Sequence, residues 1–263
     1  MNRIEAKFNE LRAKKKKAFI AFITAGDPSL EATYNLVLAL EKAGADIIEL
    51  GVPFSDPMAD GQTIQEASFR SLKRGTTLKK ILQLVRRIRK ISEVPIALMT
   101  YYNPVHYFGN ETFIDEAKSA GVDGLIIPDL PVVEAFALRG FAVKKDVSLI
   151  FFLAPTTSNE RAREIVKAAG GFIYFVSVAG VTGARASVPA SIARQVKAAR
   201  SMTKVPVCVG FGISTPQQVK DIASFADGVI VGSAIVKEIQ KHGRAKDMPA
   251  RVAAFVKRMS SVL

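Results

Sequence analysis

The stretch ADIIELGVPFSDPMADGQ, residues Ala45–Gln62, contains the pattern that decides the fold. It begins with a short, mainly apolar run, continues into a loop rich in proline, glycine and aspartate, and leads into a helical segment. A run that is apolar on both faces is typical of a parallel strand covered on both sides. The stretch therefore predicts one strand–loop–helix unit of an α/β fold.

The same unit recurs along the whole chain of 263 residues. The predicted strands are Ala18–Thr24, Ala45–Val52, Ile96–Tyr101, Gly124–Pro128, Leu149–Ala154, Phe172–Val178, Val207–Gly212 and Gly228–Gly232. The predicted helices include Asn2–Lys14 before the first strand and then Leu30–Ala43, Leu78–Ile91, Glu111–Ala120, Glu160–Ala169, Pro189–Ser201 and Pro216–Phe225. We expect an α/β fold, a single-domain (β/α)8 TIM barrel over residues 1–263 with an extra N-terminal helix. An open doubly wound sheet is the alternative, because the sequence does not show closure.

The composition excludes several classes of protein. With 49% hydrophobic and 23% charged residues, the chain is neither disordered nor of low complexity. The single cysteine, Cys208, excludes an internal disulfide framework and a cysteine-rich zinc site. No apolar run reaches the roughly 18 residues of a membrane span, and the charged N-terminal segment lacks the apolar core of a signal peptide. We therefore expect a soluble cytoplasmic protein that does not bind membranes.

The chain is strongly basic, with 37 Lys and Arg against 24 Asp and Glu and a net charge of +13. Its densest basic cluster, Lys14–Lys17, is interpreted as the solvated end of the first helix. The other basic residues are scattered and do not alternate with exposed aromatic residues, so we expect no nucleic-acid partner. The surplus fits an anionic small-molecule substrate without requiring one.

Glu49 is a carboxylate inside the second predicted strand. A parallel strand has no solvated face, so a charged group there is costly unless it is paired. Strand alternation groups Glu49 with Ala45, Ile47 and Gly51, and if this set faces the barrel interior, Glu49 points into it near the C-terminal mouth. Burial would raise its pKa and suit it to proton transfer near neutral pH. A structural salt bridge, or a strand-end residue that reaches water, is the alternative interpretation.

Two aspartates, Asp56 and Asp60, lie in the long loop that follows. In a barrel the loops after the strands form the active site, so a loop carboxylate over the same mouth as Glu49 would complete an acid–base pair. Together with Asp27 and Asp129, the same carboxylates could instead hold Mg²⁺ or Mn²⁺.

Two glycine-rich strand ends, GFGIS (Gly210–Ser214) and VGSAIV (Val231–Val236), each lead into a helix. Glycines let backbone N–H groups approach a ligand, and helix N-termini favour anions. Since barrels often bind phosphate after the seventh and eighth strands, these segments predict a phosphate site. Ser214 and Gln217 have the spacing of a capping box, which predicts the start of the intervening helix.

The segment SVAGVTGARAS (Ser177–Ser187) follows the sixth predicted strand. Its small residues and glycines are typical of a mobile lid, although an ordinary loop has the same composition. Tyr174 lies just upstream in the strand, where a tyrosine alone is more typical of a core than of a catalytic site.

Taken in chain order, several motifs together resemble the tryptophan synthase α chain family over nearly the whole sequence. They are FITAGDP (Phe22–Pro28), ELGVPFSDPMADGQTIQEASFRSL (Glu49–Leu72), MTYYNPV (Met99–Val105), PDLP (Pro128–Pro131), FLAPTT (Phe152–Thr157), GVTGAR (Gly180–Arg185), GFGIS and VGSAIV. The resemblance implies a (β/α)8 barrel lyase that cleaves indole-3-glycerol phosphate into indole and glyceraldehyde 3-phosphate in tryptophan biosynthesis. It also implies an α2β2 assembly in which the α chain uses no cofactor or metal and the β chain carries pyridoxal phosphate.

The resemblance also implies a role for each residue of the site. Glu49 is the principal acid–base group, and Asp60 is its partner beside the indole nitrogen. The implied substrate-binding residues are Phe22, Met99, Tyr101 and Phe211 at the indole, Tyr174 near the glycerol phosphate, Gly183, Gly212, Gly232 and Ser233 at the phosphate, and Thr182 over Asp60. The implied contacts with the β chain are Pro53, Phe54 and Asp56.

Two alternative functions stay open on the sequence. The chain could be another phosphate-binding barrel enzyme, such as a sugar-phosphate isomerase, which would not need the PFSDPMADG loop. It could also be a regulatory subunit that performs no chemistry, but the presence of Glu49 and Asp60 argues against that.

Overall fold

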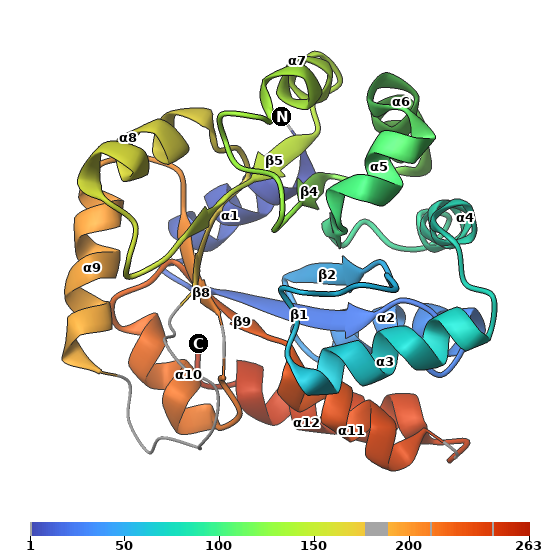
Figure 1. Ribbon diagram of the computed structural model, residues 1–263. Helices are drawn as coiled ribbons and strands as arrows, with labels where there is room; N and C mark the ends of the chain where they lie inside the picture. Colours follow the sequence, from blue (N-terminus) through green and yellow to red (C-terminus); the bar gives the residue numbers. More distant parts are fainter. Residues whose placement is uncertain (1, 177–188, 211, 244) are drawn as a thin grey trace.

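The computed structural model describes residues 2–176, 189–210, 212–243 and 245–263 (Figure 1). Its strands in these ranges are β1 (Ala18–Thr24), β2 (Ile47–Gly51), β3 (Ile96–Met99), β4 (Gly124–Ile126), β5 (Ser148–Ile150), β6 (Phe152–Leu153), β7 (Ile173–Val176), β8 (Val207–Gly210) and β9 (Gly228–Val231). They form one sheet in the order β5-β4-β3-β2-β1-β9-β8-β7-β6, and every hydrogen-bonded strand pair in these ranges is parallel.

The sheet closes through the segment around Phe151. Strands β5 and β6 flank this residue and together correspond to the single predicted strand Leu149–Ala154. One half pairs with β4 and the other with β7, so the two ends of the strand order belong to the same stretch of chain. The (β/α)8 barrel is therefore confirmed, and the open doubly wound sheet was the wrong alternative.

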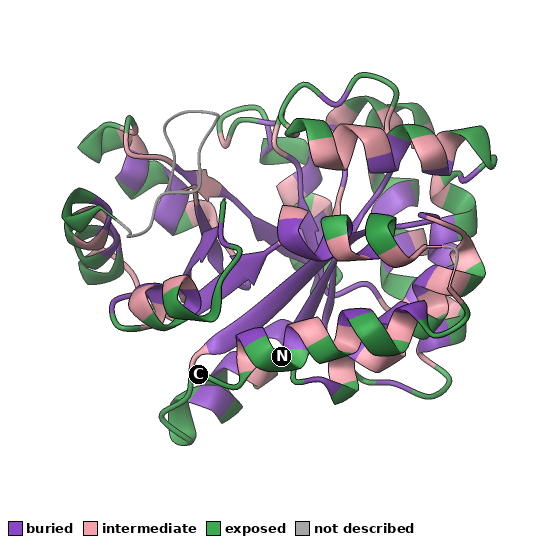
Figure 2. Ribbon diagram, turned by 90° about the horizontal axis from the view of Figure 1, so that it is seen from below, coloured by how far each residue is buried: buried purple, intermediate pink, exposed green. Residues whose placement is uncertain are grey.

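Helices surround the strands, and Figure 2 shows a buried centre inside helices whose outer faces are exposed. They are α1 (Arg3–Ala13), α2 (Leu30–Lys42), α3 (Gln62–Lys73), α4 (Leu78–Ile88), α5 (Tyr102–Phe108), α6 (Asn110–Ala120), α7 (Phe136–Lys144), α8 (Asn159–Ala168), α9 (Ala190–Ser201), α10 (Pro216–Ala223), α11 (Ser233–His242) and α12 (Met248–Ser260). None of the helices in the described ranges has the length and apolar character needed to cross a bilayer.

The capping box at the start of α10 lies one residue later than the sequence predicted. Thr215 accepts a hydrogen bond from the backbone N–H of Gln218, and the Gln218 side chain bonds back to the Thr215 N–H. The prediction of Ser214 and Gln217 was wrong because Pro216 occupies the first helical position, which places the cap on the residue directly before it.

The extra helix α1 covers the N-terminal ends of the strands. Its buried residues Ile4 and Phe8 pack with the lowest layer of side chains inside the barrel, and the Phe8 ring lies 6.0 Å from the ring of Phe172. Asn2 caps the helix and donates hydrogen bonds to Ser148 Oγ (2.7 Å) and to the carbonyl of Asp123 (3.0 Å). With this end filled, the opposite end of the barrel is left for chemistry.

Alternation along the strands sorts their residues between two apolar cores. Phe19, Ala21 and Ile23 of β1 pack in the core that includes the surrounding helices, whereas Ala18 and Ile20 belong to the barrel interior. The same parity places Phe22 and Thr24 on the interior side of β1, nearer the mouth.

Candidate active site

Glu49 lies on the interior side of β2, one step above the barrel-interior residue Ile47. It stands in register with Phe22 of β1 and Ala97 of β3, and only 1% of its surface is exposed. Neither carboxylate oxygen has a hydrogen-bond partner within the described part of the chain. The salt-bridge interpretation of Glu49 thus has no support there, and an ionised Glu49 would be uncompensated.

Burial therefore changes the acidity of two carboxyl groups. Desolvation, followed by the nearby charge of Asp60, raises the pKa of Glu49 to about 8. Desolvation also raises the pKa of Asp60 to about 6, although a hydrogen bond from Tyr101 opposes this rise. Around pH 7 the site consequently holds a protonated Glu49 beside an ionised Asp60.

Tyr101 holds the loop that carries Asp60. Its hydroxyl donates to Asp60 Oδ2 (3.2 Å) and accepts from the backbone N–H of Ala59 (2.9 Å). On its other side the Tyr101 ring stacks on Phe54, with ring centroids 5.0 Å apart. Desolvation and the Asp60 charge raise the pKa of Tyr101, so the phenol stays a hydrogen-bond donor.

An apolar cluster lines the mouth beside Glu49. The Phe22 ring occupies the space that a side chain at Gly51 would fill, and the backbone of Gly232 lies on its other side. Phe22 packs with Ala67 of α3 and Val236 of α11, and the partly buried Met99 and Ile64 border this cluster. Met99 thus packs beside Phe22, and Ile64 and Val236 are additions to this cluster. The roles of Phe22, Met99 and Tyr101 at the indole stay predictions.

Tyr174 lies on the opposite side of the barrel interior, on β7. Its ring contacts Phe152 at 4.9 Å and covers Gly210, where a side chain would meet the Tyr174 hydroxyl. Burial, together with the charges of Glu49 and Asp60, raises its pKa well above the usual value. Tyr174 therefore faces the same interior space as the two carboxyl groups, as a neutral phenol.

The glycine-rich ends of β8 and β9 lead into helices as expected. Gly212 has a φ of +72°, which favours glycine. Gly232 precedes Ser233, the first residue of α11, and no side chain caps this helix among the residues described. The first N–H groups of α11 are thus available to an anion.

The structure leaves some of the predicted residues untested. Thr182, Gly183 and Phe211, and with them the lid Ser177–Ser187, lie outside the described residues. Of the predicted partner contacts, Asp56 is exposed, Phe54 is partly buried against Tyr101, and Pro53 is buried.

The carboxylates proposed as metal ligands do not form one group. Asp27 is held by a two-point ion pair with Arg70 (2.8 and 2.9 Å), and Asp129 accepts from the backbone N–H of Tyr102. In the ranges that the structure describes, no three His, Cys, Asp or Glu side chains are arranged to hold a metal ion.

Thr24 lies at the mouth of the barrel and was not among the predicted site residues. It is 2% exposed, pairs in register with Gly51 at the mouth, and its hydroxyl has no hydrogen-bond partner in the described structure. The signal was present in the sequence, because Thr24 continues the interior set Ala18, Ile20 and Phe22. An unpartnered buried hydroxyl above Glu49 is a donor or acceptor for a ligand.

Comparison with known proteins agrees with this fold. The family described as tryptophan synthase alpha chain matches residues 8–263. The tryptophan synthase alpha chain of Geobacter sulfurreducens is 52% identical over 256 residues, which is 97% of each chain. The crystal structure of the alpha subunit from Legionella pneumophila superimposes with a TM-score of 0.92 at 39% identity, covering 100% of this chain and 98% of that one. The tryptophan synthase complex from Pyrococcus furiosus gives a TM-score of 0.84 at 38% identity, covering 93% and 98%.

We predict that Glu49→Gln removes a pH dependence of stability. A carboxyl whose pKa is higher folded than unfolded holds its proton longer in the fold, so the wild type loses stability as pH rises from about 4.5 towards 8. The free energy of unfolding of both proteins is measured in urea at pH 5 and pH 8. Between these pH values, the free energy of unfolding of the variant should rise by at least about 2 kcal/mol relative to that of the wild type. Parallel stability curves would mean that Glu49 is ionised in the fold.

We also predict that Thr24→Val separates stability from activity. Valine has the same shape and leaves no buried hydroxyl unpaired, so the urea midpoint should stay the same or rise. If the hydroxyl contacts substrate, kcat/KM should fall by about tenfold, the worth of one hydrogen bond. Thr24→Ser, which keeps the hydroxyl, is the matched control, and unchanged kinetics in Thr24→Val would remove Thr24 from the site.

Proposed function

The chain belongs to the tryptophan synthase alpha chain family, and we propose that Glu49 and Asp60 perform its acid–base chemistry. It is a lyase of tryptophan biosynthesis that cleaves indole-3-glycerol phosphate into indole and glyceraldehyde 3-phosphate. One observation carries the proposal: Glu49 is buried on the interior side of β2, and neither of its carboxylate oxygens has a hydrogen-bond partner among the described residues. Burial and the charge of Asp60 accordingly raise its pKa to about 8.

The reaction needs one proton added to the indole ring and one proton removed from the glycerol hydroxyl, and one carboxyl group can perform both transfers. Indole is a poor leaving group until its C3 atom is protonated, and protonated Glu49 is the donor. The bond from C3 to the glycerol carbon then breaks, its electron pair returns to the indole ring, and the adjacent hydroxyl becomes an aldehyde. The Glu49 carboxylate accepts the hydroxyl proton, which restores the starting state.

Asp60 stabilises the positive charge that develops on the ring nitrogen when C3 is protonated. It must be ionised and accept a hydrogen bond from the ring N–H. The Tyr101 hydroxyl bonds Asp60 Oδ2, which fixes the carboxylate and leaves its other oxygen for the substrate.

Binding of the remaining substrate follows the distribution of apolar and polar groups. Phe22, Met99, Tyr101 and Phe211 surround the indole ring, and Tyr174 stands by the glycerol chain. By the family resemblance, Gly183, Gly212, Gly232 and Ser233 would bind the phosphate and Thr182 would contact Asp60; Gly183 and Thr182 lie outside the described residues. The uncapped start of α11 supports the phosphate assignment, because helix N-termini favour anions.

Alpha chains of this family work with a β chain, and one solved relative is a tryptophan synthase complex. We propose an α2β2 assembly in which Pro53, Phe54 and Asp56 lie at the contact and pyridoxal phosphate is bound by the β chain alone. The α chain would then need no cofactor, since acid–base groups suffice for its step. One domain over residues 1–263 and a cytoplasmic location stay predictions.

Incubation of the isolated chain with indole-3-glycerol phosphate tests the proposal against its alternatives. Release of indole fits the lyase assignment, whereas a regulatory subunit or a sugar-phosphate isomerase would release none. The β chain should then be added to the same assay.

We predict that Glu49→Gln lowers kcat by more than the roughly 10²–10⁴-fold usual for one acid–base group, because Glu49 serves in two proton transfers. The variant should still bind the substrate. For the wild type, kcat/KM should rise as Asp60 ionises near pH 6 and fall as Glu49 loses its proton near pH 8. Asp60→Asn should remove the acid limb and lower the rate severely. A Glu49→Gln enzyme within tenfold of wild type would contradict the assignment.

We predict further that the β chain activates the α reaction through Phe54, Tyr101 and Asp60, which are in contact in that order. Ordering of the loop that carries Asp60 would raise kcat more than it changes KM. A tenfold gain in kcat needs only about 1.4 kcal/mol of preference for the catalytically active loop conformation. Tyr101→Phe keeps the ring on Phe54 but removes the link to Asp60.

The readout is the ratio of kcat with and without saturating β chain. In Tyr101→Phe this ratio should fall to near one while the β chain binds with unchanged affinity. Phe54→Leu is the companion variant, because it cuts the same path one contact earlier. A wild-type ratio in both variants would show that activation takes another route.

A further inference from the structure

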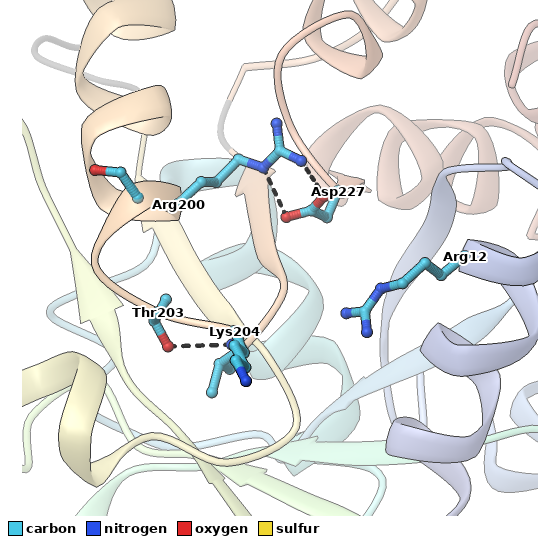
Figure 3. Close-up of a pocket in the computed structure, with 7 residues that line it drawn as sticks. Arg12, Arg200, Thr203, Lys204 and Asp227 are labelled. Atoms are coloured by element: carbon cyan, nitrogen blue, oxygen red, sulfur yellow. Dashed lines mark hydrogen bonds and ion pairs between the residues drawn. The ribbon is translucent and has the colours of Figure 1, made fainter.

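A polar cavity lies at the end of the barrel opposite the candidate active site (Figure 3). Its volume is about 420 Å³. It is formed by the C-terminal end of α1, the connection from α9 to β8, and the residue just before β9. The residues that line it are Arg12, Arg200, Ser201, Thr203, Lys204, Val205 and Asp227.

The one carboxylate in this lining is already neutralised. Asp227 accepts from Arg200 Nε (3.0 Å) and Nη2 (2.8 Å) and from the backbone N–H of Val207 (3.1 Å), and Lys17 stands 3.7 Å away. With three cations against this single anion, the lining carries a net charge of +2. The cavity therefore attracts anions.

Two of the cations are not engaged. The side chains of Arg12 and Lys204 are exposed, and neither has a hydrogen-bond or ion-pair partner within the described residues. Figure 3 shows Arg12 reaching from α1 towards the side of the cavity that holds Asp227 and Lys204. Thr203 Oγ1 accepts from the Val205 N–H (3.1 Å), so its hydroxyl hydrogen is free to donate. Three unused donors thus face one space.

We propose that this cavity is a binding site for a small phosphate-bearing anion, distinct from the phosphate end of the active site. A guanidinium presents a fork that matches phosphate oxygens, and a lysine adds a point charge. The volume lies in the usual range for small-molecule sites. The lining has no aromatic side chain on which a base could stack, which favours a small anion over a single-stranded nucleic acid.

The position of the cavity indicates what such binding does. The N-terminal face of a barrel serves stability rather than catalysis, and the ligand would join α1, the α9–β8 connection and the start of β9. A ligand that binds only the folded chain raises its stability by mass action. Turnover of the known substrate should not depend on it. The competing interpretation is that Arg12 and Arg200 merely complement the C-terminal dipoles of α1 and α9.

The test is an amide NMR titration of the full chain with pyrophosphate and, separately, with inorganic phosphate. The amides of Lys204, Val205 and Asp227 report on this cavity alone, so binding at the active site does not interfere. They should shift saturably, with an apparent Kd near or below about 1 mM. Sodium chloride at matched ionic strength should leave them almost unmoved.

Two double variants decide the outcome. Arg12→Ala with Lys204→Ala should weaken the apparent Kd at least tenfold and leave kcat unchanged. Arg74→Ala with Lys79→Ala removes the same charge from exposed residues elsewhere and should bind as wild type does. Equal shifts in both double variants, or shifts that chloride reproduces, would overturn the proposal and leave the cations as helix caps.

Discussion

The buried carboxyl group of Glu49 is the constraint on which the rest of the site depends. It stands inside an apolar barrel without a hydrogen-bond partner among the described residues, so the fold tolerates it at neutral pH because it can keep its proton. That requirement supplies what the chemistry needs, an acid that is neutral at rest and becomes a base after one transfer. Asp60 supplies the ionised carboxylate of the pair, and the hydrogen bond from Tyr101 holds it where the loop meets the mouth of the barrel.

The barrel keeps stability and chemistry at opposite ends. Helix α1 fills the N-terminal end with Ile4 and Phe8, and Asn2 ties it to the strands. At the other end, glycines make room for the functional rings: Phe22 occupies the space over Gly51, and Tyr174 that over Gly210. A side chain at either glycine would displace an aromatic ring from the site, which links the backbone pattern of the strands directly to the shape of the mouth.

The sequence predicted the strands well because each is apolar on both faces, and it identified Glu49 because a carboxylate inside such a run is physically anomalous. It could not show that residues 41 positions apart, Tyr101 and Asp60, share a hydrogen bond, since that contact depends on how the loop folds back. The sequence also could not show that the barrel closes, because closure depends on strand pairing on both sides of Phe151 rather than on any local pattern. The capping box moved by one residue because the position of the proline outweighed the spacing of Ser214 and Gln217. Thr24 was overlooked because a threonine in a strand looks ordinary until its hydroxyl is seen to lack a partner.

Glu49 rests as a neutral acid, and the titration of its carboxyl group can be observed directly. Carbon-13 NMR of the protein labelled at the glutamate side-chain carboxyl, with Glu49→Gln to assign the signal, follows that one group as the pH is varied. We predict a midpoint near pH 8 that moves to lower pH in Asp60→Asn, because the second cause of the raised pKa is the Asp60 charge. A Glu49 signal that titrates near its ordinary value of 4.5 and ignores Asp60→Asn would contradict it.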